Sequence, residues 1–234
     1  GGEAEEGKTG LAADVDTDAN VGLARGVPEE ILDSIMPISK MRKRIEERTG
    51  AGPDNVMYTL NPKVDDIPDT YRKTYNGVKL LTLGTVETGG GGCVCPEHVM
   101  LKRILSYLSL RSKDVVIMDM EAGLEHLGRG TCEGMEQFVV VIEPGARSIQ
   151  TYKNVKRLAH DLGIQTVRVV ANKVRGAEDE EFIRSKIPAE DLLGFIHYNP
   201  EVIDADRQGK SPYDVSKSAK EEIRKIKEIL DQSN

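Results

Sequence analysis

Polar side chains, most of them acidic or amide, occur at the ends of three apolar runs of this sequence, at positions where a β-strand would end. They are Asp14 and Asp16 at the run 11–15, Asp119 after the run 115–118, and Asn172 and Lys173 after the run 167–171. Ligands of open α/β sheets bind beyond the carboxyl ends of the strands. Carboxylate oxygens suit Mg²⁺, and an asparagine amide can hydrogen-bond to the edge of a nucleotide base. The pattern favours a magnesium–nucleotide site, although any one of these residues could simply end a strand.

Cys93 and Cys95 form a Cys-x-Cys pair at the end of a glycine run, directly before Pro96. Proline suits the first turn of a helix, and a helix N-terminus favours the thiolate that binds soft metals. Such metals usually need four ligands, so a site here would require two chains related by a twofold axis. A pair of ordinary loop thiols, or a redox pair, is the alternative. Cys132 is expected to be a small packed residue.

Two hydrophobic patterns predict the elements that position these residues. Short apolar runs typical of buried strands occur at 11–15, 56–60, 78–83, 115–118, 138–142, 167–171 and 192–196. Apolar residues at three- and four-residue steps predict amphipathic helices over 148–162 and 215–230. From about residue 96 the two kinds of element alternate. This order predicts an α/β fold, in which a mostly parallel twisted sheet is flanked by helices on both faces.

The chain is expected to form a single domain, because no repeat or low-complexity linker divides its 234 residues. The less regular segment 26–77 is interpreted as an insertion. The net charge of −7 leaves no general basic field, so no nucleic-acid partner is expected, and the basic stretch 40–48 is interpreted as a solvated helix face. Three cysteines favour a reducing, cytoplasmic location over a disulfide scaffold. No apolar run is long enough to predict a membrane span.

The segment 2–9 matches the phosphate-loop pattern G-x-x-x-x-G-K-[ST], but we do not expect it to bind phosphate. A phosphate loop follows a strand and opens a helix, whereas this match is followed by the strand pattern 11–15. Its three glutamates would also repel a triphosphate. We therefore expect the first strand and phosphate loop of a P-loop protein to be missing, and we expect this chain to hydrolyse ATP negligibly.

Several motifs resemble the nickel-insertion ATPases that mature carbon monoxide dehydrogenase. The motifs span nearly the whole chain and lie at 13–20 (ADVDTDAN), 61–63 (NPK), 92–95 (GCVC), 118–126 (MDMEAGLEH), 129–131 (RGT), 142–144 (IEP) and 171–173 (ANK). This family belongs to the deviant-Walker P-loop ATPases, together with septum-site and plasmid-partition ATPases. The chain departs from the family's pattern at Thr17, where proline is common, and in lacking a credible phosphate loop.

The resemblance implies a role for each matching residue. Asp16 is similar to the switch I aspartate that positions or activates the attacking water. Asp119 is similar to the Walker B carboxylate that holds Mg²⁺ through water, and Gly123 to the switch II glycine that senses the γ-phosphate. Asn172 is similar to the residue that hydrogen-bonds to the adenine edge, with Lys173 packing nearby.

The resemblance also implies cofactors and partners. These are ATP, Mg²⁺ and Ni²⁺ (or Zn²⁺), a homodimer with Cys93 and Cys95 at its interface, and carbon monoxide dehydrogenase or a related nickel enzyme as recipient of the metal. Two alternatives stay open at this point. One is a positioning or partition-type ATPase, and the other is a metal-binding dimer that does not hydrolyse ATP.

Overall fold

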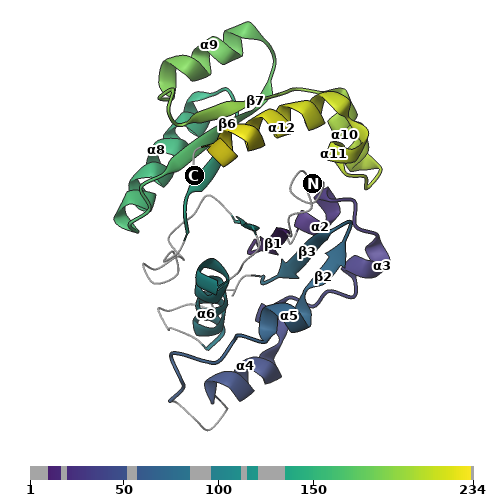
Figure 1. Cartoon of the computed structure of the whole chain (residues 1–234), viewed down its shortest axis with the longest axis vertical. Coiled ribbons are helices and arrows are strands. Elements are labelled where there is room, and N and C mark those ends of the chain that lie inside the picture. The colour runs from purple at the N-terminus through teal and green to yellow at the C-terminus, as the bar shows by residue number, and fades with distance from the viewer. Residues whose placement is uncertain are drawn as a thin grey trace.

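The computed structural model describes residues 10–16, 20–51, 57–84, 96–111, 115–120 and 135–232. In these ranges the strands form two sheets, one in the order β2-β3-β1-β4 and the other in the order β5-β6-β7. Their bounds are β1 Gly10–Asp14, β2 Lys73–Tyr75, β3 Val78–Thr82, β4 Val115–Asp119, β5 Phe138–Ile142, β6 Val167–Val174 and β7 Leu192–His197. Neighbouring strands are parallel except for the β2–β3 hairpin. Figure 1 shows the two sheets in different halves of the molecule.

Helices surround both sheets (Figure 1). Their bounds are α2 Val21–Ala24, α3 Glu29–Leu32, the 3₁₀ turn η1 Ile38–Lys40, α4 Arg42–Thr49, α5 Ile67–Tyr71, α6 Pro96–Arg111, α8 Ala146–Asp161, α9 Ala177–Lys186, α10 Pro200–Arg207, α11 Pro212–Val215 and α12 Lys217–Gln232. Among the described residues, none of these helices combines the length and the apolar character that crossing a bilayer requires.

The first sheet is packed on both faces because the side chains of β1 alternate. Leu11 and Ala13 face the larger core, where they pack with Ile104 of α6 and its neighbours. Ala12 faces the opposite side, in a smaller cluster with Val27 and Leu80.

The second sheet follows the same rule along β6. Val169 faces α8 and α9, in the core that includes Tyr152 and Ile183. Val170 faces the other side, where it packs with Leu193 and with Ile226 of α12. Helices therefore cover both faces of this sheet, as the near-continuous apolar run predicts.

The structure confirms most of the predicted elements and corrects two. Six of the predicted strands and both amphipathic helices are present, with ends shifted by a few residues. The strand predicted at 56–60 is wrong in its described part, because residues 57–60 form no strand. The segment interpreted as an insertion instead contributes β2, which pairs with β3 through a two-residue turn. Asn76 and Gly77 both have positive φ (45° and 74°), as the tight hairpin turn requires.

The single predicted sheet is divided between β4 and β5, which do not pair with one another in the described ranges. Each strand has one open face that carries large apolar side chains. Val115 and Ile117 of β4 are 39% and 63% exposed, and Val139 and Val141 of β5 are 44% and 62% exposed. The other faces of the two strands pack into the cores. Contiguous apolar side chains of this kind are typical of a face that another element covers.

His197, at the end of β7, links that strand to two helices. Its Nδ1 lies 2.8 Å from Oε1 of Glu222 in α12, and its Nε2 lies 3.2 Å from Oε1 of Glu180 in α9. The backbone N–H of His197 also donates to Glu222. Hydrogen bonding to Glu222, followed by that to Glu180, raises the pKa of His197. Arg184 also faces this cluster, because it pairs with Glu180 and lies over the ring of Phe195.

Replacing His197 with glutamine is expected to destabilise the chain in a pH-dependent way. Because the folded state raises the pKa of His197, its stabilising effect is complete below the ordinary value of 6.5 and is lost as pH rises through the raised pKa. Near pH 6 we expect a loss of about 0.5–1 kcal/mol, typical of a solvent-screened ion pair. Thermal denaturation across pH 6 to 9 would measure this, with exposed His160→Gln as the control. A difference in melting temperature between His197→Gln and the parent that stays constant with pH would contradict the prediction.

Candidate functional site

The register of β1 and β4 brings the predicted carboxylates together. Asp14 is directly opposite Asp119, at the carboxyl ends of the two parallel strands. The backbone N–H of Val15 donates to the carbonyl oxygen of Asp119 at 2.9 Å, so the pairing continues up to Asp16. Asp14 and Asp119 therefore lie on the same side of the sheet, with Asp16 beside them.

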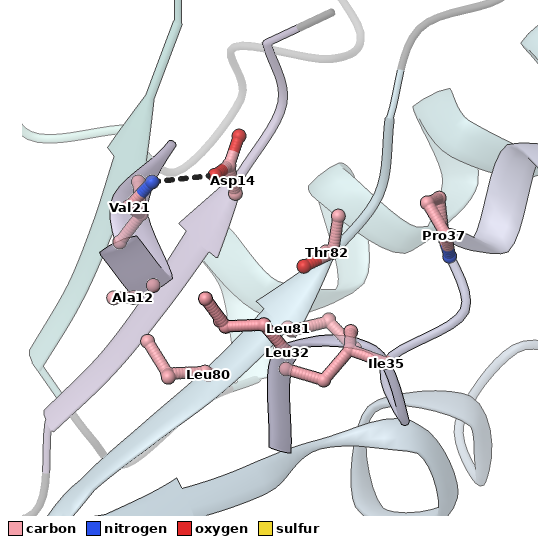
Figure 2. A pocket seen from close by; sticks show the side chains of 10 residues that line it. Ala12, Asp14, Val21, Leu32, Ile35, Pro37, Leu80, Leu81 and Thr82 are labelled. Carbon is pink, nitrogen blue, oxygen red and sulfur yellow. Dashed lines mark hydrogen bonds between the residues drawn. The ribbon is translucent and has the colours of Figure 1, made fainter. Parts of the chain in front are cut away.

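Asp14 shapes the loop that carries Asp16. Its side chain is only 3% exposed. Oδ1 accepts the backbone N–H of Asp16 at 3.2 Å, and Oδ2 accepts that of Val21 at 2.9 Å. Figure 2 shows the contact between Asp14 and Val21. One carboxylate thus ties both sides of the loop to the end of β1.

Negative charge is concentrated at this sheet edge. Burial raises the pKa of Asp14, and Asp119 and Asp16 raise it further, while the two backbone hydrogen bonds act in the opposite direction. The pKa of Asp119 is also raised, first by desolvation and then by Asp16, against a hydrogen bond from the backbone of Met120. A cation placed here would relieve this repulsion.

The carboxylates fit a magnesium ion that keeps most of its ligands as water or phosphate. In the described ranges, no three His, Cys, Asp or Glu side chains are grouped so that they could hold a metal by themselves. Mg²⁺ is commonly bound by one or two carboxylates, with waters and substrate phosphates completing its octahedron. Asp119 could supply the protein's part of that ligand set, with Asp16 beside it at the same sheet edge.

A cavity of about 100 Å³ lies beside Asp14 and is lined mainly by apolar side chains. Figure 2 shows Leu32, Ile35 and Leu80 around it. Small-molecule sites usually measure about 300–1,000 Å³, so this cavity is too small for a nucleotide. Its lining comes from the first sheet, α2, α3 and the segment after α3, and it does not define the ligand site.

Asn172 and Lys173 lie at the carboxyl end of β6, in the second sheet. The β6–β7 register shifts between Ala171 and Val174, which marks a β-bulge. Lys173 adopts a left-handed conformation with φ of 56°, and its N–H donates to Oδ1 of Asn172 at 2.9 Å. Its Nζ lies 2.5 Å from Oε1 of Glu143, directly after β5. Bulges re-aim side chains, and this one presents the Asn172 amide at the sheet edge.

Tyr198 is a candidate that the sequence analysis did not select. Its N–H donates to the carbonyl oxygen of Val174 at 2.9 Å, and its ring is 47% exposed at the carboxyl end of β7. The guanidinium of Arg175 lies 5.6 Å from the ring centroid. An exposed ring at this edge of the sheet can stack on a nucleotide base. The signal available in the sequence was an aromatic residue directly after a predicted strand.

The structure places the predicted site residues in two groups. Asp16 and Asp119 lie together at the first sheet, and Asn172 and Lys173 lie together at the second. Gly123, Cys93 and Cys95 lie outside the described residues. Asp14 belongs to the polar residues at the run 11–15, and its buried carboxylate proves to organise the loop of the first group.

Substitutions of Asp119 and Asp14 are expected to change stability in opposite directions without Mg²⁺. Since the folded state raises the pKa of Asp119, its ionised form costs stability at neutral pH, and the cost disappears as pH falls through the raised pKa toward 3.8. Asp119→Asn should therefore raise the melting temperature at pH 7 and lose this effect in acid. Asp14→Ala should cost about 1–3 kcal/mol, because it leaves backbone N–H groups without acceptors. Calorimetry of both variants would check these signs, and a destabilised Asp119→Asn would contradict the first.

Comparison with known proteins extends the geometric evidence. No protein-family profile matches the chain. Among the relatives that cover most of it, two are more than 40% identical. The carbon monoxide dehydrogenase accessory protein CooC of Rhodospirillum rubrum is 43% identical over 97% of this chain and 86% of its own length. An uncharacterised ATP-binding protein of Methanocaldococcus jannaschii is 44% identical over 92% of this chain and 84% of its own length.

Solved structures support the same fold. The septum-site protein MinD of Pyrococcus horikoshii, complexed with Mg-ADP, matches with a TM-score of 0.62 at 18% identity, over 99% of this chain and 87% of that one. A putative plasmid partition protein of Borrelia burgdorferi, bound to AMPPNP, matches with a TM-score of 0.67 at 13% identity, over 98% and 88%. At these identities the likeness shows an α/β fold of the P-loop NTPase type. With the identity to the Rhodospirillum rubrum protein, it follows that the chain belongs to the CooC family of deviant-Walker ATPases.

Proposed function

We propose that this protein is a nucleotide-driven metallochaperone that binds nickel between two copies of the chain and delivers it to carbon monoxide dehydrogenase. The nucleotide-dependent part of this proposal rests on the group of carboxylates at the carboxyl ends of β1 and β4. The relative from Rhodospirillum rubrum is a carbon monoxide dehydrogenase accessory protein, and this supports the choice of recipient.

Each described site residue has a role in the proposed nucleotide cycle. Asp119 would hold Mg²⁺ through water, and Asp16 would orient the attacking water, in a loop that Asp14 fixes. Asn172 would hydrogen-bond to the adenine edge. Bound Mg²⁺ supplies charge neutralisation of the phosphates during phosphoryl transfer, which depends on positioning more than on covalent chemistry. Gly123 would sense the γ-phosphate.

We also propose that the two sheets belong to a single P-loop NTPase-like domain. The supporting observation is the pair of open apolar faces on β4 and β5, which carry Val115, Ile117, Val139 and Val141. A strand between β4 and β5, followed by a phosphate loop and a helix, would cover these side chains and place the loop beside Asp119. The described residues do not include such a unit. Burying four aliphatic side chains would favour its docking by several kcal/mol.

Without that unit, a chain of residues 1–234 is expected to turn over ATP negligibly. The described part of the site supplies carboxylates, but no group of backbone N–H donors that could neutralise the phosphates. Release of inorganic phosphate from Mg²⁺–ATP would measure turnover, and the parent should match Asp119→Ala. Turnover that Asp119→Ala abolishes would show that this chain already contains a working phosphate loop.

Cys93 and Cys95 would provide the metal site. Two thiolates from each of two chains give the four soft ligands that nickel or zinc accepts. The homodimer would thus have the metal at its interface, and the nucleotide state would control how the dimer opens. Nickel is the cargo of this cycle, so the site has to release it as well as bind it.

Replacing both cysteines of the pair with serine is expected to abolish tight binding of nickel. A hydroxyl is a much poorer ligand than a thiolate for a soft metal, so a loss of at least about tenfold in affinity is expected. Equilibrium dialysis with Ni²⁺ would measure affinity, and the parent should bind one ion per two chains. Cys132→Ser is the matched control, because it removes the third thiol outside the pair. A double variant that binds nickel like the parent would exclude the proposed site.

A further inference from the structure

A basic groove with a volume of about 570 Å³ lies beside the start of α4. Its walls come from the segment after α3, from η1 and the start of α4, and from the junction of α5 and β2. The described residues that line it are Ser34, Ile35, Met36, Lys40, Met41, Arg42, Lys43, Arg44, Thr70, Tyr71 and Lys73. Five of them are cationic and none is acidic, in a chain whose net charge is −7.

Three of the five cations are available to a ligand. Arg44 pairs with Glu47 at 3.2 Å, and Arg42 lies 4.0 Å from Glu46, both within α4. Lys40, Lys43 and Lys73 are exposed and form no ion pair with a described residue. Like charges that face a common groove raise its electrostatic potential and attract anions.

Apolar side chains also line the groove, which distinguishes it from an ordinary solvated helix face, and we call Ile35, Met36, Met41 and Tyr71 its apolar floor. Ile35, Met41 and Tyr71 line it, and Met36 is 60% exposed. Methionine is flexible and polarisable, and it is common at surfaces that adapt to a protein ligand. The sequence pattern of 40–48 is typical of a solvated face, because a pattern along the chain does not show which distant segments enclose the same groove.

The walls of the groove are held in place by contacts that do not involve its cations. Arg48 of α4 donates to Asp66 at 2.6 Å and to the carbonyl oxygen of Lys63 at 3.2 Å, and so joins α4 to the segment before α5. The N–H of Ser39 donates to the carbonyl oxygen of Leu83, which fixes η1 to the end of β3. Ile38 and Ile45 are almost completely buried in the core below. A ligand would therefore meet a preformed surface.

We propose that the basic groove binds an acidic segment of a partner protein, with carboxylates at its lysines and an apolar side chain on the floor. Charge complementarity selects an anionic ligand, and the apolar floor selects one that alternates acidic and apolar residues. The carboxylates of the nucleotide site are not among the described residues that line the groove, so this proposal stands independently of the proposed function.

Two other occupants fit the observations less well. A nucleic acid would meet repulsion from the net charge of −7 and would leave the apolar floor uncovered. A second copy of the chain carries the same net negative charge, so bringing two copies together adds repulsion. The segment of a partner protein uses both the cations and the floor.

The test measures binding of a short fluorescein-labelled peptide of glutamate and leucine by fluorescence anisotropy at low and high salt. The triple variant K40E/K43E/K73E should bind at least about tenfold more weakly than the parent. The matched control K153E/K186E/K225E makes the same change in net charge at exposed lysines of α8, α9 and α12, and it should bind like the parent. Binding should weaken as salt increases.

The floor is tested separately from the charges. A peptide of glutamate and serine, and the variant Met36→Gln with the original peptide, should both show weaker binding. The proposal would be overturned if the two triple variants lost affinity equally or if the parent did not bind the peptide. It would also be overturned if the parent bound a labelled single-stranded oligonucleotide more tightly than the peptide. Dissociation of a dimer by K40E/K43E/K73E, seen by light scattering, would overturn it in favour of a second copy. Thermal denaturation would confirm that each variant is folded.

Discussion

The pairing of β1 with β4 is the constraint on which the candidate site depends. In a parallel pair a shift of one residue would move every side chain to the opposite face. With Asp14 opposite Asp119, both carboxylates instead lie on one face at the strand ends. The apolar alternation of β1 fixes this register, because Leu11 and Ala13 have to face the large core. The cost of bringing like charges together is therefore balanced by packing elsewhere along the same strand.

The second sheet uses a different device to present its polar residues. There, the bulge in β6 interrupts regular pairing directly after the buried run Val167–Ala171. The left-handed backbone of Lys173 is uncommon for a residue with a side chain, and the contacts to Glu143 and Asn172 hold it in place. Apolar packing thus positions the strand, and local hydrogen bonding positions the amide at its end.

The sequence was sufficient to predict the strands that carry buried apolar runs, such as Phe138–Ile142, because burial on both faces leaves a continuous pattern. The short edge strand Lys73–Tyr75 has no such pattern, since much of it is exposed, and only the Asn76–Gly77 turn marked it. The run at 56–60 is apolar enough for a strand, but Met57 and Leu60 are 83% and 72% exposed, so no core holds it in one. Hydrophobic periodicity indicates which residues are buried. It therefore does not predict a strand that pairs at an exposed edge, and it wrongly predicts a strand where an apolar run stays exposed.

Site residues could be predicted in type but not in arrangement. Asp16 and Asp119 were selected because they follow strands, and the structure adds that the strands are neighbours in register. The role of Asp14 could not be predicted, because it depends on two backbone N–H groups that only the folded loop brings to its carboxylate. The basic groove is a similar case, since its cations come from segments about thirty residues apart.

The open face of β4 couples the proposed domain completion to cation binding. Asp119 already has a raised pKa while its side chain is still accessible to solvent, because desolvation and Asp16 act together. An element that covers Val115 and Ile117 would remove further water from the same face of the strand. The carboxylate would then have to take up a proton or bind a cation, because an unpaired buried charge is costly. By linkage, bound Mg²⁺ would favour docking of the element that covers Val115 and Ile117, and docking would favour Mg²⁺ binding by the same free energy. A site built in this way stays weak for the metal until its phosphate-binding part is in place.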